Sequence, residues 1–126
     1  MQINLPDVHA ELVAVFARYE DALVNNRVDV LDELFWPSAL TVRYGAGENL
    51  VGIDAIRAFR AARPAKGLAR TLANTVLTTF GRDLGTAMTE FHRDGQARTG
   101  RQSQTWVRMP EGWRVVAAHV SLIDDG

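Results

Sequence analysis

Residues 68–123 decide the fold, and they read LARTLANTVLTTFGRDLGTAMTEFHRDGQARTGRQSQTWVRMPEGWRVVAAHVSLI. Four segments in this half of the chain have strand character, at residues 68–80, 84–93, 99–109 and 113–123. Short turn sequences separate them: Gly81-Arg82-Asp83, Asp94-Gly95 and Pro110-Glu111-Gly112. Long strands joined by short turns predict a curved, antiparallel four-stranded meander.

The first half of the chain is mainly helical. Apolar residues recur every three or four positions over residues 7–26, which predicts a helix with Asp7 as its N-cap. Shorter helices are expected over residues 28–35, ended by Trp36-Pro37, and over residues 54–63, ended by Pro64. Residues 39–44 and 48–51 flank a glycine-rich turn and are expected to form a hairpin. This order indicates one α+β domain over residues 1–126.

The composition excludes several classes of function. Hydrophobic residues make up 47% and charged residues 23% of the 126 residues, and the net charge is −1. This balance lacks the basic excess of a generic nucleic-acid-binding domain. The chain has no cysteine, so it has no disulfide, zinc–thiolate site or cysteine nucleophile. Its three histidines do not have ligand spacing, so we expect neither a metal site nor another cofactor.

Targeting signals are also missing from the sequence. The N-terminal residues lack the basic and apolar regions of a signal peptide. No apolar stretch approaches the roughly 20 residues that cross a bilayer. We therefore expect a cytoplasmic protein without a membrane partner.

Tyr19 and Arg43 are the first candidates for a functional site. Tyr19 lies in the apolar stripe of the first helix, where its hydroxyl either bonds a backbone carbonyl or faces a cavity as a proton donor. Arg43 alternates with Val42 and Tyr44. The alternation favours an Arg43 that faces solvent, but the opposite facing would direct Arg43 into a cavity, where it would need an anion.

Polar residues on the long strands supply further candidates. Arg70 and Asn74 share one predicted face near the start of the first long strand, where Arg70 is either a pocket cation or a snorkelling side chain. Gln104 and Trp106 share a face with Gln102, which fits a wet cavity or an exposed sheet face.

Other polar residues leave their location open. His119 and Ser121 have no carboxylate at triad spacing, and they face either the pocket or a dimer interface. Arg57, Arg60 and Arg63 are typical of a solvated helix end, although one of them could form the rim of an anion pocket. A site made of Tyr19, Arg43, Arg70 and Gln104 suits a small carboxylated urea or amide, but it lacks a convincing general base.

Several motifs give the chain a family resemblance. They are FARYE (16–20), LFW (34–36), TVRYG (41–45), AFRAARP (58–64), LARTL (68–72) and GRQSQTWVR (100–108). With the closing segment GWRVVAAHVS (112–121), the chain resembles the SnoaL-like, nuclear-transport-factor-like superfamily, and within it the AtzH-like and HpxZ-like proteins. The resemblance implies a cystatin-like, cone-shaped α+β barrel, in which a curved mixed sheet wraps around the N-terminal helices and leaves a pocket between them.

The same resemblance implies a reaction. Tyr19 and Arg43 match the family's catalytic pair, so Arg43 is expected to face inward, and we expect Arg70, Gln104, Asn74 and Trp106 to bind substrate. The implied activity is hydrolysis of a C–N bond, from 1,3-dicarboxyurea to allophanate and ammonia, in cyanuric acid or purine-nitrogen breakdown. Arg43 and Arg70 would bind the carboxylates, Gln104 would orient the urea carbonyl, and Tyr19 would protonate the leaving nitrogen or position water.

Two other functions remain open at this stage. One is a non-catalytic, carboxylate-binding accessory subunit of an amidase in oxalurate or ureide catabolism. The other is proton transfer like that of ketosteroid isomerases, which would use Glu48 or Glu90 as the base in an apolar pocket. A homodimer formed through the open sheet is expected for all three functions. A small arginine-rich pocket would favour the function that acts on a carboxyurea.

Overall fold

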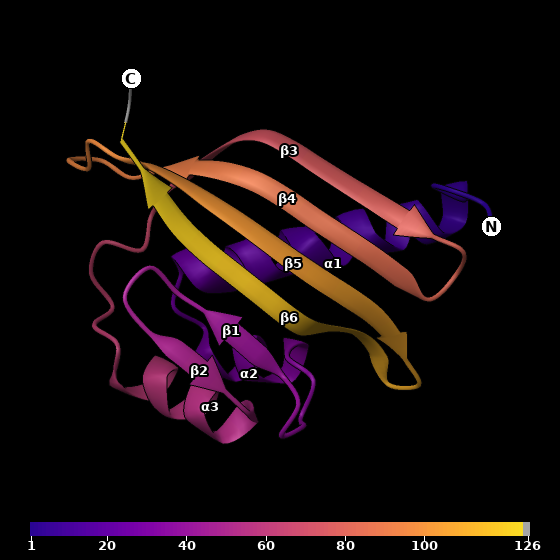
Figure 1. The fold of residues 1–126 in the computed structure, drawn as a ribbon, viewed down its shortest axis with the longest axis horizontal. Helices are drawn as coiled ribbons and strands as arrows, with labels where there is room; N and C mark the ends of the chain where they lie inside the picture. Colours follow the sequence, from indigo (N-terminus) through magenta and orange to yellow (C-terminus); the bar gives the residue numbers. More distant parts are fainter. Residues whose placement is uncertain (125–126) are drawn as a thin grey trace.

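The structure is a computed structural model that describes residues 1–124, and it consists of three helices and a six-stranded sheet over those residues (Figure 1). The elements are α1 (Pro6–Val24), α2 (Val28–Leu34), β1 (Val42–Tyr44), β2 (Asn49–Val51), α3 (Ile53–Ala62), β3 (Thr71–Phe80), β4 (Leu84–His92), β5 (Thr99–Met109) and β6 (Gly112–Ile123). The predicted order of helices, hairpin and meander is confirmed, as is the α+β class.

Several element boundaries differ from the prediction by a few residues. Helix α1 begins at Pro6, and Asp7 lies in its first turn instead of capping it. The helix has no side-chain cap, and Pro6 suits the first helical position because its missing N–H would have no partner there. Strands β1 and β3 each begin three residues later than expected. In the case of β1, the preceding residues form a turn closed by Thr41 N–H and Ser38 C=O.

The sheet is mixed because of one parallel pairing. Its strand order is β2-β1-β6-β5-β4-β3, and strands β3 to β6 form the predicted antiparallel meander. Strand β1 runs parallel to β6, with Arg43 opposite Ala118. This pairing joins the helical half of the chain to the last strand and determines where Arg43 lies.

One face of the sheet carries the hydrophobic core. Helix α1 crosses behind the meander, while α2 and α3 lie beside the β1–β2 hairpin (Figure 1). Leu12 of α1, Phe35 after α2, and Trp106 of β5 are all buried in this core. On β5 the buried Gln102 and Gln104 alternate with more exposed neighbours, so the opposite face of the sheet is open to solvent.

Two irregularities in the ladders change which side chains share a face. In the β5–β6 ladder the register shifts between Thr105 and Trp106 of β5. These two residues pair with Ala117 and Val115 of β6 and leave Val116 as an extra residue in β6. Trp113 and Val115 are therefore buried, whereas His119 lies on the open face. Strict alternation along this segment would predict that Trp113, Val115 and His119 share one face, and the extra residue makes that prediction wrong. A second shift, between Ala73 and Val76 in β3, contains Asn74 with a φ of 53°.

Neither membrane-spanning helices nor metal-binding clusters are found in the described part of the chain. No helix there has the length and hydropathy to span a bilayer. Residues 1–124 also contain no group of three or more histidine or acidic side chains arranged to hold a metal ion.

Candidate functional site

A small cavity lies between the inner face of the sheet and the helical half of the chain. Its volume is about 290 Å³. Helix α1 contributes Tyr19, the β1–β2 hairpin contributes Arg43 and Glu48, and β5 contributes Gln102. Arg63, Lys66, Arg70 and Arg93 complete a set of five cationic side chains in its wall. Glu48 is the one acidic residue that lines this cavity among residues 1–124.

Tyr19 has a fixed ring and an unpaired hydroxyl. Its side chain is 4% exposed, and its ring packs edge-on against Trp106 with centroids 6.2 Å apart. Phe35 packs against the same ring at 6.3 Å. Within residues 1–124 no hydrogen bond joins the Tyr19 hydroxyl to another protein group, although Tyr19 lines the cavity. A phenol held in this way is placed to donate its proton to a bound molecule.

Arg43 faces the cavity and not solvent. Its guanidinium Nη1 donates to Glu48 Oε1 over 2.9 Å, and its Cζ lies 5.4 Å from the centre of the Phe59 ring. The alternation of side chains favoured solvent, whereas the family resemblance implied the inward facing that the structure has. Leu40 and Tyr44, which alternate with it, are the exposed residues.

Arg70 belongs to a buried network of its own. Its Nε and Nη2 each donate to one oxygen of Glu20 over 2.7 Å, which makes the ion pair bidentate. Nη2 also donates to Gln102 Oε1 over 3.0 Å, and Cζ lies 4.5 Å from the centre of the Phe91 ring. Arg70 thus reaches the cavity wall with its charge already matched by Glu20.

Arg63 and Arg93 differ from Arg43 and Arg70 because neither has an acidic partner in the described residues. Arg63 directly follows α3, and its Nε and Nη2 are buried without a hydrogen-bond partner. Arg93 directly follows β4, and its Nε is also buried and unpartnered. Burial lowers the pKa of both guanidinium groups. The positive charge of Arg70 lowers both pKa values further.

A further arginine, Arg60 of α3, is buried but does not line the cavity. Its side chain is 2% exposed, its Nη1 has no hydrogen-bond partner, and its Cζ lies 4.2 Å from the centre of the Phe35 ring. Burial lowers the pKa of Arg60 to about 10. The expectation of a solvated helix end is therefore wrong for Arg60, although Arg57 on the same helix is exposed.

Gln104 and Trp106 lie behind the cavity wall. Trp106 is fully buried, and its indole Nε1 donates to Gln104 Oε1 over 3.0 Å. Gln104 lies between Ala87 and Ala118 on the neighbouring strands, whose small side chains leave room for it. Both residues support the ring of Tyr19, and the glutamine that lines the cavity is Gln102, whose Nε2 is buried without a partner.

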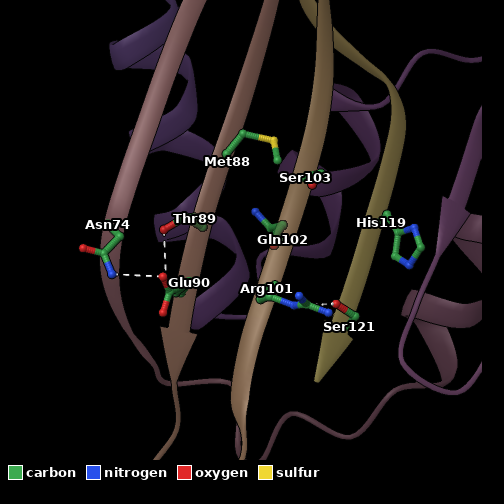
Figure 2. A pocket seen from close by; sticks show the side chains of 9 residues that line it. All are labelled: Asn74, Met88, Thr89, Glu90, Arg101, Gln102, Ser103, His119 and Ser121. Carbon is green, nitrogen blue, oxygen red and sulfur yellow. Dashed lines mark hydrogen bonds between the residues drawn. The ribbon is translucent and has the colours of Figure 1, made fainter. Parts of the chain in front are cut away.

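Asn74 does not share the cavity with the other predicted site residues. It lies in the β3 irregularity, and its side-chain amide donates to Glu90 Oε2 over 2.9 Å (Figure 2). Both belong to a shallow hollow of about 460 Å³ on the open face of the sheet, together with His119 and Ser121 (Figure 2). Asn74 therefore lies too far from Tyr19 and Arg43 to bind the same small ligand.

Sequence reasoning missed Gln102, Glu20 and Arg93 as parts of the site. The sequence pattern placed Gln102 only as a neighbour of Gln104. Which of the two glutamines reaches the cavity depends on its position along the strand. Arg93 precedes Asp94-Gly95 and is typical of a solvated turn. The one available signal was that a cavity rich in arginine needs acidic partners, and Glu20 adjoins Tyr19 in the sequence.

Comparison with known proteins assigns the chain to a family. The AtzH-like family model matches residues 1–126. The chain belongs to the AtzH-like family. No curated protein sequence matches this AtzH-like chain.

Solved structures resemble the AtzH-like chain closely. A protein of unknown function of the DUF3225 family from Pectobacterium atrosepticum is 63% identical, with a TM-score of 0.96 over 97% of this chain and 95% of that one. A cystatin-like fold protein from Burkholderia xenovorans is 47% identical, with a TM-score of 0.96 over 100% and 99% of the two chains. A nuclear transport factor 2-like protein from Salmonella enterica is 26% identical, covers 94% and 93%, and has a TM-score of 0.76. The fold is thus cystatin-like, as expected.

Proposed function

We propose that this AtzH-like protein breaks a C–N bond of a small N-carboxylated urea, 1,3-dicarboxyurea, and forms allophanate in the breakdown of cyanuric acid or of purine nitrogen. The observation that carries this proposal is the excess of positive charge around a cavity of about 290 Å³, where two carboxylates, Glu48 and Glu20, offset only part of the charge of five cationic side chains. Such a cavity favours a small anion with more than one negative charge.

The expected release of ammonia does not balance. Dicarboxyurea and allophanate each contain two nitrogen atoms, so the group that leaves is one carboxylate, as carbon dioxide. The bond between that carboxylate carbon and nitrogen breaks, its electron pair stays on nitrogen, and nitrogen takes up one proton. Carbon dioxide then hydrates to bicarbonate in water. The scissile bond is still the C–N bond of a carboxyurea, as the family resemblance implies.

This balance changes what the site must supply. Loss of carbon dioxide from an N-carboxylate needs a proton at nitrogen and needs no base to activate water. The Tyr19 hydroxyl, which is unpaired within the described residues, is the proton donor we propose. The missing general base is then no objection to catalysis.

Arg43 and Gln102 have supporting roles in this proposal. The guanidinium of Arg43 stabilises the negative charge that develops on the urea as the bond breaks. For this contact the substrate displaces Glu48, which now pairs with Arg43 over 2.9 Å. The free Nε2 of Gln102 donates to the urea carbonyl, which is the role expected for Gln104 from the sequence.

The test is carbon dioxide release from freshly generated 1,3-dicarboxyurea, measured against its uncatalysed breakdown. The wild type is expected to exceed that background, whereas Tyr19→Phe and Arg43→Gln are expected to fall to it or within a few per cent of it. Tyr44→Phe and Arg57→Gln are matched controls, since Tyr44 and Arg57 are both exposed. A wild type that does no better than background overturns the proposal, and binding without turnover would favour the accessory-subunit role.

Neither of the two bases expected for the isomerase alternative has the surroundings that this reaction needs. Glu90 lies on the open face of the sheet, where it accepts a hydrogen bond from Asn74. Glu48 does line the cavity, but Arg43 pairs with it, and the surroundings are cationic instead of apolar. The cavity, as residues 1–124 line it, therefore lacks the free carboxylate in apolar surroundings that this reaction needs.

We also propose that a second copy of the chain covers the open face of the sheet. One register row crosses that face through Val76, Met88, Ser103, His119 and Tyr44. Three members of this row are exposed large side chains, with Val76 57%, Met88 46% and Tyr44 41% accessible. In the next outward-facing row Glu90 of β4 lies beside Arg101 of β5. A twofold axis could place the acidic residue of one copy against the basic residue of the other, so the face is complementary to itself.

A further inference from the structure

The cations of the cavity fall into two groups. Arg43 pairs with Glu48 and Arg70 pairs with Glu20, at 2.9 Å and 2.7 Å, so the protein supplies the counter-charge for both. Arg63 and Arg93 have no such partner in residues 1–124, although both line the cavity and are partly buried. Lys66, the fifth cation of the cavity, also has no acidic partner in residues 1–124, but it is exposed. The buried positive charge that remains for a ligand is therefore concentrated on Arg63 and Arg93.

The unpaired atoms of Arg63 have a specific geometry. They are Nε and Nη2, which form one edge of the guanidinium group and point in parallel. That edge is the one that binds both oxygens of a carboxylate, as Arg70 does with Glu20. Buried donors that lack a partner cost free energy, so a ligand that accepts from them gains more than one that meets solvated donors.

Arg93 approaches the same ligand from the other half of the fold. It follows β4 in the meander, whereas Arg63 follows α3 in the helical half. Its Cζ lies 4.9 Å from the centre of the Phe91 ring, and its buried Nε is free to donate. Burial and the positive charges of Arg70 and Arg63 lower the pKa of Arg93, so an anion shared by Arg63 and Arg93 would offset the repulsion between them.

We propose that Arg63 and Arg93 form a carboxylate clamp, which holds the carboxylate that the substrate keeps. This inference rests on the proposed function for the identity of the substrate, but the clamp itself is a binding site for small carboxylates. It assigns to Arg63 and Arg93 the anchoring role that the family resemblance implied for Arg70. With one carboxylate fixed there, the scissile end of the molecule is left for Tyr19 and Arg43.

The test is the binding of glutarate, a stable dicarboxylate with the same number of chain atoms as dicarboxyurea. Isothermal titration calorimetry would compare the wild type with Arg63→Gln and Arg93→Gln. Each variant is expected to weaken binding at least about tenfold, because charge-assisted hydrogen bonds are lost. The double variant is expected to lose less than the product of the two single losses, since both arginines hold one carboxylate. Arg57→Gln, on the exposed side of α3, is expected to bind like the wild type.

Further measurements separate the clamp from a fold defect and from the reaction. Circular dichroism checks that each variant folds, and Arg63→Lys is expected to weaken binding although it keeps the charge, because a lysine cannot bind both oxygens. Unchanged glutarate binding in Arg63→Gln and Arg93→Gln, or none in the wild type, overturns the clamp. If the variants lose glutarate binding but the wild type releases no carbon dioxide, the clamp stands and the proposed reaction fails.

Discussion

Phe91 of β4 lies directly against Gly100 of β5, so closely that a Cβ at position 100 would lie 2.1 Å from Cζ of the ring. The two residues are register partners, and the absence of a side chain at Gly100 makes room for the ring. The same ring contacts Arg70 and Arg93, whose Cζ atoms lie 4.5 Å and 4.9 Å from its centre. A glycine on one strand thereby positions two cations of the cavity.

Gly100→Ala is therefore expected to damage both stability and binding. The methyl group would displace a fully packed ring, at a cost of about 1–3 kcal/mol, and would move the two arginines that rest on it. Urea denaturation measures the first effect, and glutarate titration measures the second. Gly47→Ala is the control, because nothing lies within 4 Å of the Cβ it would add. A Gly100→Ala protein as stable as the wild type would contradict this account of the ring.

Arg60→Met is expected to make the protein more stable and less active. The folded protein holds the Arg60 charge buried, without an acidic partner among residues 1–124, and burial lowers its pKa to about 10. A basic group whose pKa is lower in the folded state than in the unfolded state destabilises the fold at every pH below its folded-state pKa. This destabilisation decreases as the pH rises through that pKa. Methionine removes this cost at neutral pH, so we expect a gain of about 1 kcal/mol or more.

Activity should change in the opposite direction in the same variant. Arg60 stacks on Phe35, and Phe35 packs against the ring of Tyr19. Without the guanidinium group the two rings are held less firmly, so Tyr19 is positioned less well and carbon dioxide release should fall. Thermal unfolding at pH 7 and the release assay measure the two effects. A less stable Arg60→Met protein would mean that the Phe35 contact outweighs the burial of charge.

Local signals in the sequence predicted the order of elements well. Apolar periodicity and turn residues depend on neighbours in the chain, so the helices and the meander were found to within a few residues. The direction in which the Arg43 side chain points could not be predicted from such local signals. Strand β1 has three residues, and an alternation that short does not decide which side chains face inward. Pairing with β6, more than seventy residues away in sequence, determines it. The family resemblance supplied what the local pattern lacked.

The irregularities in β3 and β6 had no signal in the sequence. One extra residue, Val116, reverses the facing of every later position in β6, yet valine is an ordinary strand residue. For the same reason Asn74 was placed with Arg70, although it lies on the open face. The sequence also could not predict that Arg63 and Arg93 have no acidic partner among the described residues. This depends on which carboxylates the fold brings close to each arginine.

Glu11 should make the stability of the protein depend on pH in the acid range. Its Oε1 accepts hydrogen bonds from Trp113 Nε1 and Arg108 Nε, at 2.9 Å and 3.0 Å. The Trp113 bond and then the Arg108 bond hold the pKa of Glu11 below its usual 4.5. A carboxyl with a lowered pKa stabilises the fold above that usual value and loses the effect as pH falls through the lower one.

Glu11→Gln is therefore expected to lower stability at pH 7 by about 1 kcal/mol, discounted because the ion pair is partly exposed. The difference from the wild type should shrink as pH is lowered from 5 to about 2, which thermal unfolding at several pH values would measure. Asp7→Asn, at an ion pair with Arg82 on the surface, is the control and should change little. A constant difference across this pH range would show that the carboxylate charge is not the cause.

Met88→Glu tests the proposed pairing of two copies through the open face. Met88 lies near the middle of β4, directly beside Val76 of the edge strand β3, and its side chain is 46% exposed. A twofold axis near it would bring two copies of the introduced carboxylate together in an apolar contact, and their repulsion and desolvation should separate the copies. Light scattering after size-exclusion chromatography should show a dimer for the wild type and a monomer for Met88→Glu. Val13→Glu, at an exposed apolar position on α1, which packs on the opposite face, should remain dimeric. A monomeric wild type, or a Met88→Glu dimer as tight as the wild type, would show that this face is not the interface.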